Sequence, residues 1–200
     1  MPRPMVRILL RAMDEVMGPR GVDSVLQRAS MEALRTEDVA AASDRGVSFE
    51  SISLIMRTLE DVHGQPSGRG LALRIGRACL KYGLKAYGFT PPGAESTFRL
   101  LPLSEKLRAG AAALAGFLNR HSDMHIAVED HGHQILWRIE RCPLCRGREA
   151  DDPVCLLAVG FIQESLEWAS GGRPFYVQEQ GCIAAGDAAC AILVHTMPAD

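Results

Sequence analysis

The spacing of apolar residues changes near residue 124. In the first part of the chain apolar residues recur every three or four positions, as in Val6, Leu10 and Met13, which is the period of an amphipathic helix. After residue 124 they recur at every second position, as in Ile126 and Val128, which is the period of a half-buried strand. Helices followed by short strands predict an α+β fold with an antiparallel sheet.

Breaks in the helical pattern divide the first part of the chain into several helices. The predicted helices span residues 6–17, 22–34, 48–64, 71–88 and 103–122. We expect Gly18 to separate the first two, and Ser48 or Ser51 to cap the third. Residues 65–70, QPSGRG, are expected to form a loop, and Ser104 is expected to cap the last helix.

Two predicted hairpins flank one more helix in the second part of the chain. Residues 124–142 alternate on both sides of the turn DHGH, which is typical of an antiparallel hairpin. Residues 153–172 form a helix with Pro153 near its start and two glycines at its end. A second hairpin, residues 173–195, follows. The predicted order is N-terminal helices packed on a small antiparallel sheet, with a ββαββ unit at the C-terminal end.

Composition restricts the number of domains and the kind of partner. With 200 residues, 47% of them hydrophobic, the chain can form one substantial core. We expect a single domain over residues 1–200, with a helical part at 1–120 and a ββαββ part at 121–200. The formal charge of -2 offers no basic surplus for nucleic acid, and no apolar run approaches the ~20 residues that span a bilayer. We therefore predict a cytoplasmic protein, with cysteines that are thiols or metal ligands.

Three of the six cysteines lie in the stretch RCPLCRGREADDPVC, residues 141–155. Cys142 and Cys145 have the separation of half a zinc knuckle, but the usual second half is missing from the sequence. Three interpretations of this pair remain open. The two thiols could be alternative ligands of a zinc ion held elsewhere, a redox pair, or part of an inert turn.

The last hairpin contains a second group of metal-binding side chains. Its sequence EQGCIAAGDAAC holds Glu179, Cys182 and Cys190, with a Gly-Asp pair able to turn the chain between the cysteines. Cys155, at the first turn of the preceding helix, could supply a fourth ligand. Because zinc takes four tetrahedral ligands from converging segments, these residues predict a Cys3Glu site. The alternative is that the cysteines are small buried apolar side chains.

The segment from DDPVC to CAILV resembles the 4-vinyl reductase domain family, named for proteins linked to bacteriochlorophyll synthesis. The shared pattern is acidic-x-Pro-x-Cys, a helix, a Gly-Arg-Pro strand, Glu-x-x-Cys, and a Cys eight residues later. The same domain forms the sensor of phenol-responsive activators, and Cys155, Glu179, Cys182 and Cys190 match its zinc ligands. The resemblance covers about residues 124–195 and implies a fold shared with haem-based nitric-oxide sensors and Golgi transport subunits.

Aromatic side chains offer candidates for a ligand pocket. Trp137, Phe161, Trp168 and Phe175 can be interpreted as core or as the lining of an apolar pocket between helices and sheet. The family reading favours Trp137 and Phe161 for the pocket.

Four histidines gather around the first predicted hairpin: His121, His125, His131 and His133. Their density suggests metal or haem ligation, but polar residues are also expected in a turn. No predicted helix presents an obvious proximal histidine for a haem.

Three functions are compatible with this sequence. The first is a zinc-stabilised domain that binds a hydrophobic small molecule, such as a tetrapyrrole, a hydrocarbon or an aromatic compound, for sensing or delivery. The second is a 4-vinyl reductase, or its accessory subunit, in bacteriochlorophyll synthesis. We expect no catalytic residue in the chain itself, because it lacks a Gly-x-Gly-x-x-Gly turn and would need an external electron donor. The third is an interaction scaffold, and a homodimer is expected in each case.

Overall fold

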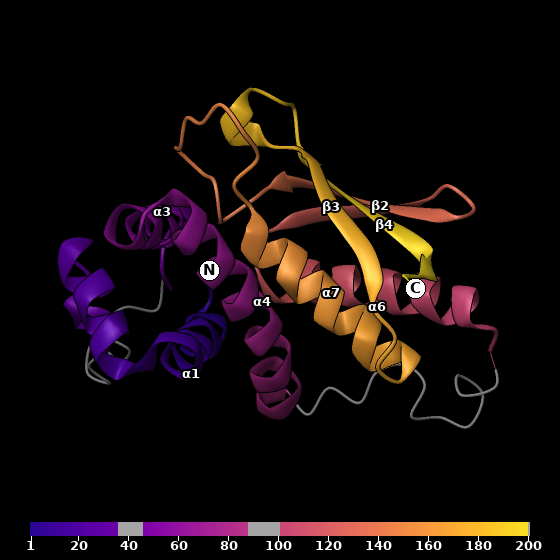
Figure 1. Ribbon diagram of the computed structural model, residues 1–200, viewed down its shortest axis with the longest axis horizontal. Coiled ribbons are helices and arrows are strands. Elements are labelled where there is room, and N and C mark those ends of the chain that lie inside the picture. Colours follow the sequence, from indigo (N-terminus) through magenta and orange to yellow (C-terminus); the bar gives the residue numbers. More distant parts are fainter. Residues whose placement is uncertain (36–45, 88–100, 200) are drawn as a thin grey trace.

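The computed structural model describes residues 1–35, 46–87 and 101–199. Its helices are α1 (Arg3–Arg28), α3 (Phe49–His63), α4 (Gln65–Tyr87), α6 (Leu103–His121) and α7 (Leu156–Ser170), with short 3-10 helices η1 (Glu32–Arg35) and η2 (Ile183–Ala185). The strands are β1 (His125–Asp130), β2 (Gln134–Arg141), β3 (Phe175–Gly181) and β4 (Cys190–Pro198). The expected α+β architecture, with helices before a ββαββ unit, is confirmed (Figure 1).

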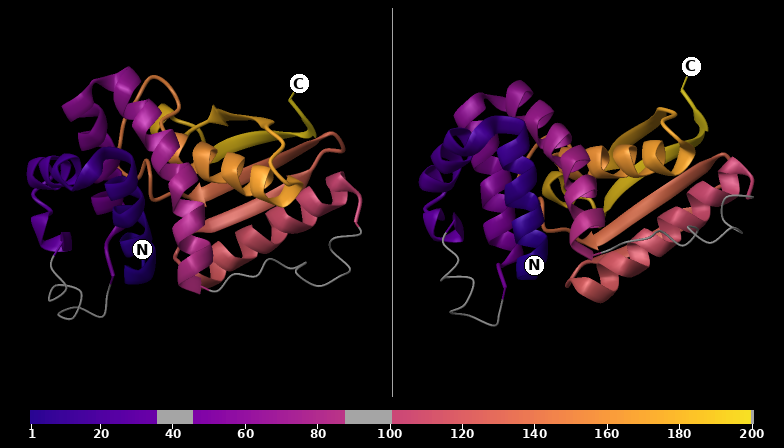
Figure 2. Two further views of the ribbon diagram at one scale, coloured as in Figure 1. Left: turned by 60° about the horizontal axis from the view of Figure 1, so that its bottom comes forward. Right: turned by 90° about the horizontal axis from the view of Figure 1, so that it is seen from below.

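The four strands form one antiparallel sheet in the order β1-β2-β4-β3. Alternate residues of β2, namely Ile135, Trp137 and Ile139, are buried. Helix α6 packs on β1 and α7 packs on β3, so both cover the same face of the sheet (Figure 2). Helices α1, α3 and α4 gather beside the end of the sheet where β2 finishes. None of the helices in the described part of the chain is long and apolar enough to cross a membrane.

Two glycines allow α4 and α7 to touch through their backbones. A Cβ atom added to Gly76 would lie 2.0 Å from the carbonyl oxygen of Leu157, and one added to Gly160 would lie 2.0 Å from that of Leu73. Real Cβ atoms do not approach an oxygen so closely. The close packing of α4 on α7 therefore requires a glycine at both positions. The α4–α7 contact therefore joins the N-terminal helices to the ββαββ unit.

At the surface, an ion-pair network also links α4 to α7. The guanidinium of Arg77, on α4, donates to Glu164 at 2.8 Å and to Glu167 at 2.5 Å, both on α7. The pKa of Arg77 rises because the attraction of these two carboxylates outweighs the effect of its partial burial. Because the groups are partly exposed, the network contributes modestly to stability and mainly fixes the relative rotation of the helices.

Local signals set several of the helix boundaries. Gly18 has a φ of 74° and interrupts α1, as expected, and Ser48 caps α3 by accepting a hydrogen bond from the Ser51 amide at 3.0 Å. The predicted loop at residues 65–70 is wrong, since α4 begins at Gln65. Pro66 lies in the first turn of α4, where a missing N–H costs nothing.

The prediction that Ser104 caps α6 is also wrong. The cap position is Pro102, and Ser104 lies inside the first turn of the helix. No side-chain cap is present at this end of α6. The serine therefore indicated approximately where α6 begins, but it is not the residue at the N-cap position.

Candidate metal centre and apolar cavity

Five cysteine side chains converge at the end of the sheet beside the N-terminal helices. Cys142 and Cys145 follow β2, Cys155 directly precedes α7, Cys182 follows β3, and Cys190 begins β4. None is more than 2% exposed, and all five are free thiols. The structure thus joins the two cysteine groups that are separate in the sequence.

Three of the sulfur atoms have the spacing of a tetrahedral metal site. The Sγ–Sγ distances are 3.8 Å for Cys155–Cys182, 3.7 Å for Cys155–Cys190 and 3.9 Å for Cys182–Cys190. A zinc ion with four thiolates at about 2.3 Å places its sulfurs about 3.8 Å apart. These three side chains therefore stand at three corners of a zinc-sized tetrahedron.

Glu179 lies beside this triangle of sulfur atoms and could supply the fourth ligand. Its carboxylate belongs with the three cysteines to a group whose ligand atoms are all within 4.8 Å of one another. Oε2 accepts a hydrogen bond from the Cys155 amide at 2.7 Å, whereas Oε1 is buried without a partner among the described residues. Burial first, and then the neighbouring Cys182, raise the pKa of Glu179 to about 8. A buried carboxylate is stabilised by pairing with a cation or by coordinating a metal, so Glu179 is suited to be a metal ligand.

Cys142 and Cys145 form a second group with two of the same residues. Their sulfurs, together with those of Cys155 and Cys190, also lie within 4.8 Å of one another. The sulfur of Cys142 is 3.5 Å from that of Cys155, and the sulfur of Cys145 is 3.3 Å from that of Cys190. The Cys-Pro-Leu-Cys pair is therefore part of the cluster, with Cys155 and Cys190 common to both groups.

Backbone hydrogen bonds hold the β3–β4 turn in the shape that the cluster requires. The carboxylate of Asp187 accepts from the Cys182 amide at 2.7 Å, and the Asp187 amide donates to the Cys182 carbonyl at 3.2 Å. Gly186, with a φ of 95°, permits the tight return of the chain. The amide of Ile183 points at the sulfur of Cys190 at 3.5 Å, which favours a thiolate there.

The crowded thiols of the cluster shift one another's pKa values in opposite directions. The pKa of Cys145 is far below its ordinary value because the surrounding thiols, Cys142 first, donate hydrogen bonds to its sulfur. The pKa of Cys155 is far above its ordinary value because its own proton is held by the same neighbours. A thiol must lose its proton before it can bind a metal, so metal binding by these side chains would release protons.

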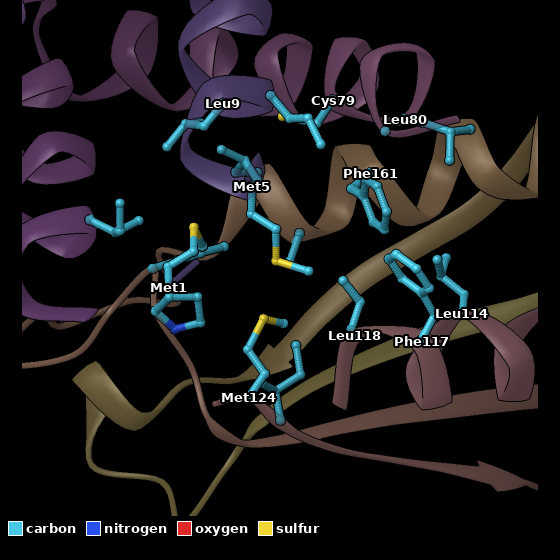
Figure 3. Close-up of a pocket in the computed structure, with 18 of the residues that line it drawn as sticks. Met1, Met5, Leu9, Cys79, Leu80, Leu114, Phe117, Leu118, Met124 and Phe161 are labelled. Carbon is cyan, nitrogen blue, oxygen red and sulfur yellow. The ribbon is translucent and has the colours of Figure 1, made fainter. Parts of the chain in front are cut away.

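An apolar cavity of about 160 Å³ lies next to the cluster. Its wall includes Met5 of α1, Leu80 of α4, Phe117 of α6 and Phe161 of α7, whose side chains surround the open space in Figure 3. Residues 142–144 close another side. Of the described residues, no histidine and no charged side chain lines this cavity.

The aromatic candidates from the sequence occupy different places. Phe161 lines the cavity. Trp137 is 3% exposed on β2 and Phe175 is 6% exposed on β3, and both are outside the cavity wall. Trp168 is 49% exposed on α7. The indole Nε1–H of Trp137 is buried and has no hydrogen-bond partner in the described part of the chain.

Sequence patterns did not point to the methionines of the cavity wall. Met1 and Met5 line the cavity from the N-terminal segment, and Met124 lines it from the residue before β1. The eight methionines of the sequence are a weak signal, because flexible thioether side chains also fill ordinary cores.

The four histidines do not form a metal group. His125 pairs with Glu140 at 2.6 Å, whereas His131 lies 3.4 Å from Glu129 on the same hairpin. The ring of His121 stacks on that of Phe117, with centroids 4.4 Å apart. Within residues 1–35, 46–87 and 101–199, the groups able to hold a metal consist of cysteines and Glu179.

Comparison with solved structures shows the fold. An H-NOX protein from S. oneidensis in the Fe(II)NO ligation state matches with a TM-score of 0.56 and 12% identity over 98% of both chains. An H-NOX variant from T. Tengcongensis matches with a TM-score of 0.60 and 13% identity over 100% of both chains. The phenol-responsive sensory domain of the transcription activator PoxR, with phenol, matches with a TM-score of 0.55 and 17% identity over 74% of both chains.

Sequence comparisons give no family. No family model matches the chain, and no curated protein is significantly similar to it. The chain therefore has the fold of these sensor domains, at identities too low to carry their ligands over.

Haem, which the family resemblance associates with this fold, does not fit the cavity. Haem iron is held by histidine, a cysteine thiolate, a tyrosine, or methionine paired with histidine. No histidine lines the wall in the described chain, and burial raises the pKa of Cys79 to about 12 and also raises that of Tyr87. These groups are therefore neutral, and 160 Å³ is small beside the roughly 300–1,000 Å³ of larger ligand sites.

Proposed function

We propose that this chain is a zinc-stabilised domain that binds a hydrophobic small molecule for sensing or delivery. The apolar cavity between α1, α4, α6 and α7 is the observation that carries this proposal. Its 160 Å³ is close to the ~150 Å³ of an engineered apolar cavity that stays dry and binds benzene. Apolar surface in such a site favours an uncharged guest, because no charged group of the wall would have to be desolvated.

Cavity size and lining narrow the class of ligand. A monocyclic aromatic compound or a short hydrocarbon fits this volume, whereas a tetrapyrrole would require the helices to separate. Trp137 is two residues from Ile139, a wall residue, on the same buried face of β2, which places them about 7 Å apart. Trp137 lies outside the wall, so its unpaired indole N–H would donate to the oxygen of a phenol-like ligand that extends past Ile139.

The proposed zinc ligands are Cys155, Glu179, Cys182 and Cys190, with Cys142 and Cys145 as alternatives. Four protein ligands leave no open coordination position, so the ion would have a structural role. It would tie the β3–β4 turn to the start of α7 and satisfy the free oxygen of Glu179. The ion supplies no reaction step in this proposal.

Two short segments connect the cavity to the cluster. Cys142 lines the cavity, and its sulfur lies 3.5 Å from that of Cys155. Cys155 directly precedes α7, whose first turns contribute Leu157, Ala158 and Phe161 to the cavity wall. A ligand that moves either segment would therefore change the surroundings of the metal site, which supports a sensing role.

The reductase alternative rests on the resemblance to the 4-vinyl reductase family. It requires an external electron donor and a substrate much larger than the cavity. Donor-dependent loss of a vinyl absorption band in a chlorophyll precursor would favour this alternative over binding alone.

A cavity-filling substitution tests the binding proposal. Gly83 lines the cavity on α4, and a Cβ there would meet no atom within 4 Å. Gly83→Leu should fill the space and abolish the rise in Tm that toluene or phenol gives to the unaltered protein. Gly70→Leu is the matched control, because Gly70 is exposed on the same helix and is also unobstructed.

Two results would count against this proposal. One is a wild-type Tm that neither compound changes, which would favour the interaction scaffold. The other is undiminished ligand stabilisation in Gly83→Leu.

A further inference from the structure

The cysteine cluster contains more ligands than one zinc ion can use. Six side chains belong to the two groups, namely Cys142, Cys145, Cys155, Glu179, Cys182 and Cys190. A structural zinc ion takes four. We propose that the cluster holds two zinc ions, which share Cys155 and Cys190 as bridging thiolates. This inference rests on the zinc site of the proposed function and adds a second ion to it.

The geometry divides the ligands into two tetrahedra with one common edge. The common edge is the Cys155–Cys190 pair, whose sulfurs are 3.7 Å apart, close to the about 3.8 Å edge of a zinc–thiolate tetrahedron. Glu179 and Cys182, from the end of β3, complete the first ion. Cys142 and Cys145, from the segment after β2, complete the second.

The second pair of ligands is placed as closely as the first. Cys142 approaches one bridging sulfur at 3.5 Å, and Cys145 approaches the other at 3.3 Å. Two cysteines with two residues between them, as in Cys-x-x-Cys, are a common half of a zinc site. Cys155 and Cys190 would thus supply the second half of the zinc knuckle that is missing from the sequence pattern. Cys155 is 13 residues from Cys142 in the sequence, and Cys190 is 45 residues from Cys145.

Charge is compatible with two ions. One zinc bound by three thiolates and a carboxylate leaves a net charge of about −2 and two buried neutral thiols. Two zinc ions bound by all six anionic ligands leave the same net charge of about −2. The second ion therefore adds no buried charge, and its binding releases the protons of Cys142 and Cys145 to solvent.

A second ion would also fix one wall of the cavity. Cys142, Pro143 and Leu144 line the cavity, and coordination of Cys142 and Cys145 would anchor both ends of this segment. The occupied cavity and the second ion would then stabilise each other through residues 142–144.

Metal content of the full-length chain tests this inference. Elemental analysis and native mass spectrometry of protein produced with zinc should give two ions per chain. Cys142→Ser combined with Cys145→Ser should give one ion and unchanged circular dichroism. Cys79→Ser is the control, since Cys79 is buried on α4 outside both groups, and it should retain two ions.

Cobalt substitution gives a readout that does not depend on a variant folding. Two Co(II) ions that share thiolates couple magnetically, so the wild-type chain loaded with two equivalents of cobalt should show a weaker paramagnetic resonance signal per cobalt than the same chain loaded with one equivalent.

One ion per wild-type chain would overturn the second site and leave the first intact. No metal, or iron in place of zinc, would overturn both, and two ions in the double variant would overturn the assignment of Cys142 and Cys145.

Discussion

The cysteine cluster and the apolar cavity adjoin each other but are built in opposite ways. The cluster takes its six side chains from residues 142–190, and each stands at or near the end of a strand or helix. The cavity takes its wall from residues as distant as Met1 and Phe161, most of them on four helices that pack together. Ligands at element ends follow from local spacing, whereas a cavity follows from the way that whole helices pack.

The two regions should therefore respond differently to substitution. If the cluster binds zinc as proposed, loss of a ligand residue removes a metal bond on which folding depends. A change in the cavity wall should instead alter binding of the proposed ligand with little effect on the fold. Three predictions test this contrast, beginning with the largest expected effect.

Cys190→Ser should be the most damaging single substitution, because Cys190 belongs to both metal groups. We expect loss of zinc, exposure of the β3–β4 turn, and a decrease in stability of at least about 5 kcal/mol, or roughly 10–20 °C in Tm. Zinc release to a coloured chelator and thermal melting measure this. Cys79→Ser provides the comparison, and an equal metal content in both variants would remove Cys190 from the ligand set.

Gly160→Ala should have an intermediate effect, because it disrupts the α4–α7 contact that joins the N-terminal helices to the ββαββ unit. The new Cβ would stand 2.0 Å from the Leu73 carbonyl oxygen and force α4 and α7 apart. We expect a loss of about 2–4 kcal/mol in the free energy of unfolding. Gly83→Ala, on α4 where space is open, should be neutral or stabilising by up to about 1 kcal/mol. Chemical denaturation compares them, and equal stabilities would contradict the close contact.

Trp137→Phe should have the smallest effect on stability, within about 1 kcal/mol, because it removes a buried N–H that has no partner among the described residues. Its expected effect is on selectivity. Phenol affinity should fall about three- to tenfold, as for loss of one hydrogen bond, while toluene affinity stays the same. Calorimetric titration measures both ligands, and a parallel change for the two would exclude Trp137 as a donor to the ligand.

Much of the fold could be predicted because its signals are local. The change of period near residue 124, the break at Gly18 and the cap at Ser48 each depend on a few neighbouring residues. The start of α4 was missed because Pro and Gly in residues 65–70 are also compatible with a first helical turn. Gly68 in that turn lies against the backbone of Glu60, a tertiary contact that the sequence alone does not reveal.

The candidate metal site could be predicted from the sequence only in part. The spacing of Cys155, Glu179, Cys182 and Cys190 indicated that they could meet, and the structure places their ligand atoms within 4.8 Å. The convergence of Cys142 with Cys155 depends on how the segment after β2 folds back. The spacing of apolar residues in the sequence does not predict the conformation of that segment. The lining of the cavity was also hard to predict. Whether Trp168 faces the cavity or the solvent depends on the rotation of α7 about its axis, which the sequence does not reveal.

Methyl NMR of selectively labelled methionines tests the central claim, that the cavity binds a small hydrophobic molecule. Met5 and Met124 line the cavity, whereas Met13 is buried elsewhere and Met197 is 62% exposed. Titration with toluene should shift the Met5 and Met124 methyl signals saturably, leave those of Met13 and Met197 in place, and have no effect in Gly83→Leu. Unchanged Met5 and Met124 signals at saturating toluene, or equal shifts in Gly83→Leu, would contradict it.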